Sequence, residues 1–335
     1  MVTLSDKTEQ KRVLLKLDHV KKYFPIKGGV LQRVVGNVKA VEDVSLELYE
    51  GESLGVVGES GCGKSTLGRT ILGLEDATDG KIKFRKEEIQ DLKRKEKLKF
   101  VKEMQMIFQD PFASLNPRQR IGDALEEVFI LHTDMKAKER RKAVLDLLVE
   151  VGLKEEHYDK YPHEFSGGQR QRIGIARAIA LNPSFIICDE AVSALDVSVQ
   201  AQVLKLLKTL QDKYQLSYLF ISHDLGVVRY FCDRVLVMYL GSTVELGTVE
   251  DLFEKPLHPY TQALLSSIPR PAVNANRSRV RLQGDIPNPA NPPSGCPFHT
   301  RCPIAQEVCK QDKPEWSEYE PDHFAACHFA GTSII

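Results

Sequence analysis

One stretch of the sequence combines three glycines with a lysine and several hydroxyls: Gly58-Glu-Ser-Gly-Cys-Gly-Lys-Ser-Thr66. It fits the pattern G-x-x-x-x-G-K-[ST], with a compact apolar run before it and an expected helix after it. The glycines allow a tight turn that aims several N–H groups at one phosphate, and the helix adds its positive N-terminal end. We therefore predict a phosphate-binding loop, in which Lys64 neutralises the β- and γ-phosphates and Ser65 ligates Mg²⁺.

Two adjacent acids end a second apolar run, Phe185-Ile-Ile-Cys-Asp-Glu190. A carboxylate at the carboxyl end of a parallel strand faces the ligand crevice of such a sheet. Asp189 is then placed to hold Mg²⁺, and Glu190 to orient or deprotonate a water. Acids also favour a helix N-terminus, and only the presence of the phosphate loop decides between the two interpretations.

Four of the seven cysteines lie close to the C-terminus: Cys296, Cys302, Cys309 and Cys327. An odd total without a secretion signal argues against a disulfide framework. Four thiolates suit Zn²⁺ or an iron–sulfur cluster; the lack of C-x₂₋₄-C pairs and the two Cys-Pro steps favour the cluster. Packing without a metal is the third alternative. The interleaved His299, His323 and His328 are expected at the surface or beside the ligands.

Composition limits the class of protein. The 335 residues carry 46 Lys+Arg against 46 Asp+Glu, which gives no whole-chain argument for a polyanionic partner. The longest apolar run, Val235 to Leu240, is far shorter than the roughly 20 residues that span a bilayer. The N-terminus lacks the apolar stretch of a signal peptide. We expect a soluble, intracellular chain of about two domains.

The apolar pattern predicts the elements that position these residues. Residues 14–48 alternate as antiparallel strands, and 122–151 show helical spacing. The charged stretch 81–103 predicts a solvated helix or hairpin. After residue 183, strands alternate with helices, which implies a mostly parallel sheet covered on both faces. Proline is concentrated after residue 250, so we place a boundary near 255.

A further motif makes the sequence resemble a known family. Phe165-Ser-Gly-Gly-Gln-Arg-Gln-Arg172, at the start of an expected helix, resembles the signature motif of ATP-binding cassette (ABC) proteins. The other motifs of that family follow in order. Gln109 in Ile107-Phe-Gln-Asp-Pro111 resembles the Q-loop glutamine, Ser193-Ala-Leu-Asp196 the D-loop, and His223 in Ile221-Ser-His-Asp224 the switch histidine. Phe24, or its neighbour Tyr23, resembles the aromatic that stacks on adenine. Ala191 departs from the proline that is common after the glutamate.

The resemblance implies a P-loop NTPase (RecA-like) α/β fold: a parallel sheet core, an antiparallel β subdomain and an inserted helical subdomain at about 110–180. The cassette is expected over 11–255, followed by a small loop-rich C-terminal domain over 256–335. The catalytic residues would be Glu190, His223, Lys64 and Gln109, and the Mg²⁺ ligands Ser65, Gln109 and Asp189. The positions expected to contact ATP are Phe24, Gly58, Glu59, Ser60, Gly61, Cys62, Gly63, Lys64, Ser65, Thr66, Gln109, Ser166, Gly167, Gly168, Gln169, Asp189, Glu190, Asp196 and His223.

The helix that begins at Ser166 is a second phosphate-binding N-terminus. One ATP hardly needs two such ends from distant parts of one chain, so we expect a head-to-tail pair of cassettes, each signature motif capping the partner's nucleotide. The second cassette would be identical or a paralogue. The resemblance implies that ATP closes the pair and that hydrolysis releases it.

The residues after the cassette indicate which subgroup of ABC proteins the chain resembles. Pro256-Leu-His-Pro-Tyr-Thr-Gln-Ala-Leu-Leu265 and Leu282-Gln-Gly-Asp-Ile-Pro-Asn-Pro-Ala-Asn-Pro-Pro-Ser-Gly-Cys296 resemble the C-terminal extension of oligopeptide/dipeptide importer ATPases. This implies a peripheral subunit on the cytoplasmic face of the membrane, two permease subunits and, indirectly, an extracytoplasmic peptide-binding protein. It also implies a [4Fe–4S] cluster on the four cysteines, with Zn²⁺ as the alternative, and no nucleic-acid partner. The competing function is a soluble ABC ATPase in repair, assembly or regulation, whose cysteines form a nucleic-acid-binding knuckle.

Overall fold

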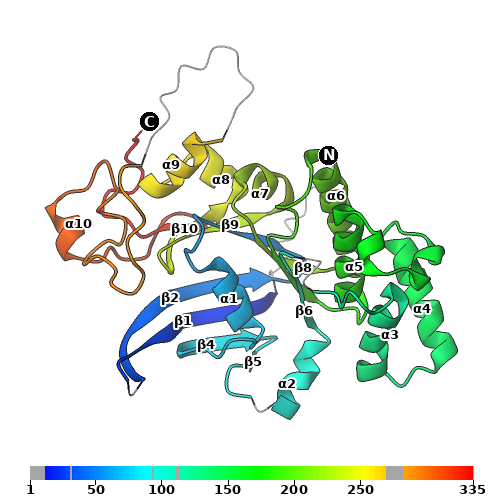
Figure 1. The fold of residues 1–335 in the computed structure, drawn as a ribbon. Helices are drawn as coiled ribbons and strands as arrows, with labels where there is room; N and C mark the ends of the chain where they lie inside the picture. Colours follow the sequence, from blue (N-terminus) through cyan, green and yellow to red (C-terminus); the bar gives the residue numbers. More distant parts are fainter. Residues whose placement is uncertain (1–11, 31, 93, 111–113, 269–281, 335) are drawn as a thin grey trace, which may run out of the picture.

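The computed structural model of this chain describes residues 12–30, 32–92, 94–110, 114–268 and 282–334. Two β-sheets form its centre, and helices cover them (Figure 1). The expected cassette start at residue 11 and Pro111 of the Q-loop motif lie outside the described residues. No helix within the described ranges is both long and apolar enough to cross a membrane.

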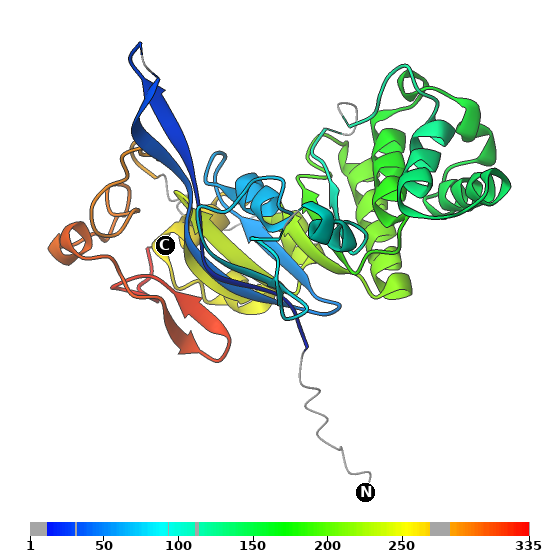
Figure 2. The same ribbon diagram turned by 90° about the horizontal axis from the view of Figure 1, so that it is seen from below.

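The smaller sheet is antiparallel, as the alternation over residues 14–48 predicts. Its strand order is β2-β1-β4-β5. Its members are β1 (Val13–Gly28), β2 (Arg33–Tyr49), β4 (Asp79–Phe84) and β5 (Glu87–Glu88). The first two strands are long rather than short, and they form a hairpin that projects from the body of the molecule (Figure 2). The charged stretch 81–103 holds both expected forms, the β4–β5 hairpin and the helix α2 (Arg94–Val101).

The larger sheet carries the functional residues. Its order is β11-β12-β10-β9-β3-β8-β7-β6, and the five strands from β9 to β6 are parallel. Those five are β3 (Ser53–Val57), β6 (Met104–Ile107), β7 (Phe185–Asp189), β8 (Ser217–Ile221) and β9 (Arg234–Tyr239). Every residue of β3, β7, β8 and β9 is buried, which fits a sheet covered on both faces. The predicted parallel sheet is confirmed.

Helices connect the parallel strands. Around the sheet lie α1 (Lys64–Ile71), α6 (Val197–Tyr214) and α7 (Leu225–Phe231). Between β6 and β7 the chain forms a helical lobe, which we define as α3 (Ile121–His132), α4 (Ala137–Glu150), the 3₁₀ turns η1 (Glu155–Asp159) and η2 (Pro162–Glu164), and α5 (Gly167–Ile179). This lobe stands to one side of the sheets in both views (Figures 1 and 2). The spacing over 122–151 correctly predicts its first two helices.

The C-terminal extension is built onto the larger sheet. After β10 (Ser242–Thr248) come α8 (Val249–Glu254), α9 (Pro259–Ser266), α10 (Glu307–Gln311), β11 (Ser317–Glu320) and β12 (His323–Ala325). β12 pairs with β10, and the buried carboxylate of Glu245 on β10 accepts hydrogen bonds from the amides of Leu257 and His258 and lies 2.8 Å from His323 Nε2. The extension therefore continues the sheet, and the domain boundary at 255 stays a prediction.

Candidate nucleotide-binding site

The phosphate loop (residues 58–66) joins β3 to α1, as the sequence predicts. Gly63 has φ +105°, and a Cβ there would lie 2.0 Å from the carbonyl oxygen of Ala40, so only glycine fits this position. The buried ammonium of Lys64 donates to the carbonyl oxygens of Gly58 (2.8 Å) and Glu59 (3.0 Å). The loop is thus wrapped around the one cation that the motif supplies.

Ser65 and Asp189 meet beside this loop. The Ser65 hydroxyl, in the first turn of α1, donates to Asp189 Oδ1 at 2.7 Å, at the end of β7. Burial raises the pKa of Asp189 above its usual value, partly offset by this hydrogen bond. A hydroxyl and a carboxylate oxygen so placed are donors that Mg²⁺ accepts, so these residues fit the ion that accompanies ATP.

Three adjacent parallel strands bring their following residues together at Glu190. Gln109 Nε2, after β6, donates to Glu190 Oε2 at 2.9 Å, and His223 Nδ1, after β8, lies 3.4 Å from the same oxygen. Glu190 follows β7 with φ +48°, and its amide donates to Ile221 O at 3.0 Å. The structure therefore brings together the predicted Gln109, Glu190 and His223 at the carboxyl edge of the sheet.

The signature residues lie elsewhere. Ser166 is the N-cap of α5 and forms a capping box with Gln169, which binds the Ser166 amide through its side chain (3.0 Å). Ser166 and Gly167 are exposed; Gly168 is buried, and a Cβ there would lie 2.4 Å from Val199 Cγ1. Asp196, at the start of α6, is exposed as well. Because α5 belongs to the helical lobe, it is separated from α1 in both views (Figures 1 and 2).

The two candidate adenine-stacking residues are both half-buried on β1. The Tyr23 hydroxyl donates to Glu42 Oε2 at 2.6 Å, and burial raises its pKa. Phe24 has the ammonium of Lys22 4.7 Å from its ring centroid. A ring tied through its hydroxyl is less free to adapt to a base, which favours Phe24, but the stacking role stays a prediction.

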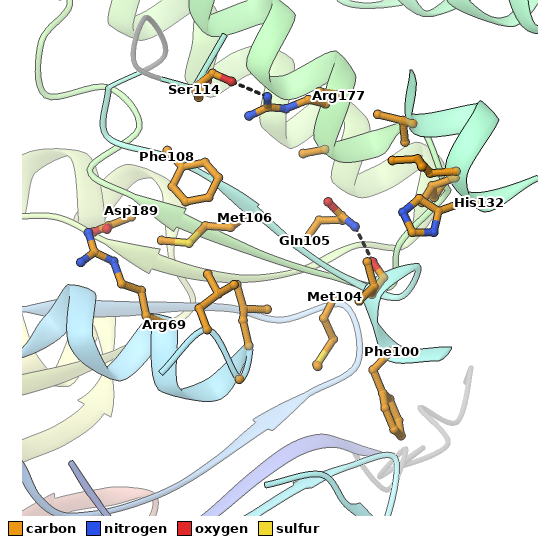
Figure 3. Close-up of a pocket in the computed structure, with 18 of the residues that line it drawn as sticks. Arg69, Phe100, Met104, Gln105, Met106, Phe108, Ser114, His132, Arg177 and Asp189 are labelled. Atoms are coloured by element: carbon orange, nitrogen blue, oxygen red, sulfur yellow. Dashed lines mark hydrogen bonds between the residues drawn. The ribbon is translucent and has the colours of Figure 1, made fainter. Parts of the chain in front are cut away.

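A cavity of about 1350 Å³, which the sequence patterns do not predict, lies beside this site. It lies between α1 and β6 on one side and α3 and α5 on the other, and both Gln109 and Asp189 line it. Figure 3 shows Arg69 next to Asp189, Phe108 pointing into the space, and Arg177 of α5 hydrogen-bonded to the Ser114 carbonyl (2.6 Å). Only the neighbourhood of Gln109 could have indicated this cavity, because its walls come from many elements that are separate in the sequence, among them α1, α2, β6, α3 and α5.

Contacts between the phosphate loop and the extension were also missed. Arg301 pairs with Glu59, and Tyr260 accepts a hydrogen bond from the Glu59 amide. In the sequence, the only pattern around Arg301 is that of the neighbouring cysteines, which does not indicate a contact with the phosphate loop.

The four C-terminal cysteines lie in one region of the extension. Burial, together with the neighbouring thiols of Cys309 and Cys302, raises the pKa of Cys296 to about 11, and that of Cys327 is about 12 for similar reasons. Among the described residues, no group of three or more His, Cys, Asp or Glu side chains is arranged to hold a metal ion. The iron–sulfur and zinc expectations therefore find no direct support in this arrangement.

The fold, the phosphate loop and the residues gathered at Glu190 define a P-loop ATPase. The family model "ABC transporter" matches residues 41–193, and "Oligopeptide/dipeptide transporter, C-terminal region" matches 244–309. The chain belongs to the ATP-binding subunits of ABC transporters, within the oligopeptide/dipeptide family. ATP hydrolysis is the activity of such subunits.

Two relatives and one solved structure illustrate the similarity. The oligopeptide transport ATP-binding protein AppF of Bacillus subtilis is 56% identical over 94% of this chain and 97% of its own length. The dipeptide transport ATP-binding protein DppF of Haemophilus influenzae is 48% identical over 97% and 99%. The ATP-binding cassette MJ0796, in a dimeric post-hydrolysis state with ADP and Pi, has a TM-score of 0.63 and 30% identity, covering 70% of this chain and 99% of that one. Neither a repair nor a nucleic-acid function finds support in these relatives.

Proposed function

We propose that this chain powers the uptake of oligopeptides or dipeptides through a membrane permease by hydrolysing Mg·ATP. The convergence of Gln109 and His223 on one oxygen of Glu190 carries the catalytic part of the proposal. The printed names of AppF and DppF, which are peptide transport ATP-binding proteins, support the substrate class.

In the proposed reaction, the backbone amides of the phosphate loop and Lys64 hold the phosphates. Bound Mg²⁺ would neutralise charge on the phosphate oxygens, held by Ser65 and Asp189, with Gln109 near the same edge. Glu190 accepts a proton from the attacking water. Gln109 and His223 hold Oε2 of Glu190, which orients its carboxylate, and His223 also reaches the γ-phosphate.

A second cassette completes this site in our proposal. The N-terminus of α5 is exposed at Ser166 and Gly167, and a helix of 13 residues presents partial positive charge there. Because it faces outward, this N-terminus is accessible to the nucleotide of another chain. The dimer described for MJ0796 supports this arrangement, and the second chain is either a copy or a paralogue.

The cavity beside Gln109 is the proposed docking site for a cytoplasmic helix of the permease. Leu74, Phe108 and Leu131 line it and are 59%, 38% and 68% exposed, an apolar rim that an amphipathic helix would cover. Because Gln109 and Asp189 share the cavity wall, the docked helix would sense the nucleotide. This would place the chain on the cytoplasmic face of the membrane, with two permease subunits and, indirectly, an extracytoplasmic peptide-binding protein.

We also propose that the four cysteines ligate a [4Fe–4S] cluster. The Phe329 amide donates to Cys327 Sγ at 3.4 Å, and the backbone at Phe298 and Ile304 acts to lower the pKa of Cys296 and of Cys302 against the effect of burial. Such donors stabilise thiolates, and in a cube each thiolate binds its own iron, so the four need not converge on one point. Iron and sulfide analysis of anaerobically purified protein tests this; stoichiometric zinc without iron would contradict it.

The function itself is tested by isolating the native complex and identifying its subunits. We expect co-purification with a multi-span permease and ATP turnover that peptide-loaded binding protein stimulates in vesicles. The Lys64→Ala complex is the control, because it should assemble without turnover. A chain that purifies without permease subunits, or whose turnover responds to nucleic acid instead of peptide, would contradict the proposal.

A further inference from the structure

An ion pair between a buried arginine and a half-buried glutamate joins the C-terminal extension to the phosphate loop. The Arg301 guanidinium donates to both carboxylate oxygens of Glu59, at 2.6 Å to Oε2 and 3.0 Å to Oε1. The Arg301 side chain is only 7% exposed. A bidentate arginine–carboxylate pair fixes both distance and orientation, so Glu59 is held in one geometry.

A second bond from the extension reaches the same residue. The Glu59 amide donates to the Tyr260 hydroxyl at 2.8 Å, and Tyr260 packs against Tyr239 and Phe298. The main chain and the side chain of Glu59 are therefore both held from outside the loop. Since its amide already has a partner, Glu59 anchors the loop instead of offering that amide to phosphate.

The segment between Cys296 and Cys302 is folded so that it presents Arg301. Two successive turns, closed by His299 N to Cys296 O and Arg301 N to Phe298 O at 3.0 Å each, place the side chain under the loop. Its Nε is buried without a hydrogen-bond partner among the described residues, so the guanidinium depends strongly on Glu59. Removing Glu59 leaves the buried Arg301 charge uncompensated, and removing Arg301 leaves a half-buried carboxylate without its partner.

We propose that Arg301 is a positioning residue for ATP binding, acting through Glu59. Arg301 holds the first turn of the phosphate loop in the shape that aims the later amides at phosphate, and it neutralises a carboxylate that would repel the nucleotide. A preordered loop loses less conformational entropy on binding, so the pair raises affinity without taking part in the reaction. This inference rests on the proposed function of the same loop.

The chain contains a matched control at the opposite end of β3. Arg234 Nη1 binds Glu52 Oε1 at 3.1 Å, and both side chains are 8% exposed. Glu52 precedes β3 and Glu59 follows it, so the two pairs share a strand and a similarly buried arginine, although the Glu59 carboxylate is more exposed (27%) than that of Glu52 (8%). Breaking the Glu52 pair should destabilise the fold without reaching the nucleotide.

The test measures the dissociation constant for Mg·ATP by calorimetry on the full chain, with the thermal midpoint recorded in parallel. Arg301→Ala is expected to weaken binding about tenfold, and Arg301→Lys less, because one donor is restored. Tyr260→Phe, which removes a single hydroxyl, should weaken it less than either. Arg234→Ala, or Arg234→Lys where the alanine variant does not fold, should lower the thermal midpoint and leave affinity unchanged. In the complex, Arg301→Ala should raise KM for ATP with kcat at saturation unchanged.

A double variant tests whether Arg301 acts on ATP affinity through Glu59. Adding Glu59→Gln to Arg301→Ala should cause no further loss of affinity, because both changes break the same contact. Unchanged affinity in Arg301→Ala, equal losses in Arg301→Ala and the Arg234 control, or additive losses in the double variant would each overturn the inference. A wild-type chain that does not bind ATP would instead overturn the proposed function, and with it this inference.

Discussion

The phosphate loop and the signature helix are the two helix N-termini that we propose bind phosphate, and their surroundings in the structure differ. At the phosphate loop, Lys64 and Asp189 are buried and hydrogen-bonded within the chain. At the signature helix, Ser166 and Gly167 are exposed, and Ser166 bonds to its own helix. We call the phosphate loop with Asp189 the first half of the site, and the fold of one chain assembles it. We call the N-terminus of α5 the second half, and its exposed donors face solvent.

This difference indicates how ATP could control association. Donors at a helix N-terminus that face solvent gain most when an anion is brought to them. A nucleotide held in the phosphate loop of one cassette supplies that anion to another. Substitutions in the first half should therefore change ATP binding or hydrolysis at the chain's own site. Substitutions in the second half should change hydrolysis of the ATP that the partner cassette holds.

The largest effect is expected at Glu190. Glu190→Gln replaces the carboxylate, our proposed base, by a carboxamide of the same shape, so turnover in the complex should fall about a hundredfold to ten-thousandfold with ATP affinity preserved. Rapid-quench hydrolysis and equilibrium binding on the same preparation check this, with the surface change Glu155→Gln as the control. Wild-type turnover in Glu190→Gln would remove the base from the proposed reaction.

Lys64→Ala should weaken the binding of ATP, the step before hydrolysis. The ammonium donates to two loop carbonyls and in our proposal also binds the phosphates, so its loss should raise the dissociation constant for ATP about a hundredfold. Titration of a fluorescent ATP analogue measures it, and Lys95→Ala, on the exposed helix α2, is the control. An unaltered dissociation constant would contradict the assignment of this loop.

Acidification should weaken the first half of the site through Asp189. Because burial raises its pKa above the ordinary aspartate value of 3.8, its carboxylate takes up a proton at a higher pH than an ordinary aspartate as the pH falls. Mg²⁺ requires the ionised form, so the stimulation of ATP binding by Mg²⁺ should decline as pH is lowered, with ATP in EDTA as the reference. Asp189→Asn should abolish that stimulation at every pH; a stimulation that persists in this variant would assign the ion to other ligands.

A smaller effect is expected from His223→Ala. The histidine lies 3.4 Å from Glu190 and shares that task with Gln109, so one orienting contact remains and turnover should fall about tenfold. Steady-state kinetics should show the loss in kcat instead of KM. A combined His223→Ala and Gln109→Ala variant should lose more than either alone, and equal losses in all three would argue against shared orientation of Glu190.

Much of the first half of the site could be predicted from the sequence, because its residues lie within short motifs. The phosphate loop and the pair Asp189-Glu190 each lie directly after a strand whose apolar run marks it, and parallel strands bring their ends to one edge. The separation of Ser166 from Lys64 followed from the same local reasoning about two helix N-termini.

The contacts between distant segments could not be predicted. Arg301 meets Glu59 across most of the chain, and nothing in the residues around either one marks the other. β12 pairs with β10 in the larger sheet, and His323 of β12 lies 2.8 Å from the buried Glu245 carboxylate, which nothing in the sequence distinguishes from the other acids. The cavity likewise depends on how the helical lobe stands against β6.

The claim that two cassettes share each nucleotide site is tested most directly by Ser166→Arg. This substitution places a bulky side chain at the exposed end of α5. Equilibrium ATP binding to the isolated chain and ATP turnover of the assembled complex are measured for this variant beside Lys64→Ala. We predict that Ser166→Arg binds ATP as the wild type does and loses most turnover, whereas Lys64→Ala loses both. Weakened ATP binding in the isolated Ser166→Arg chain, or undiminished turnover in its complex, would contradict a site shared between two cassettes.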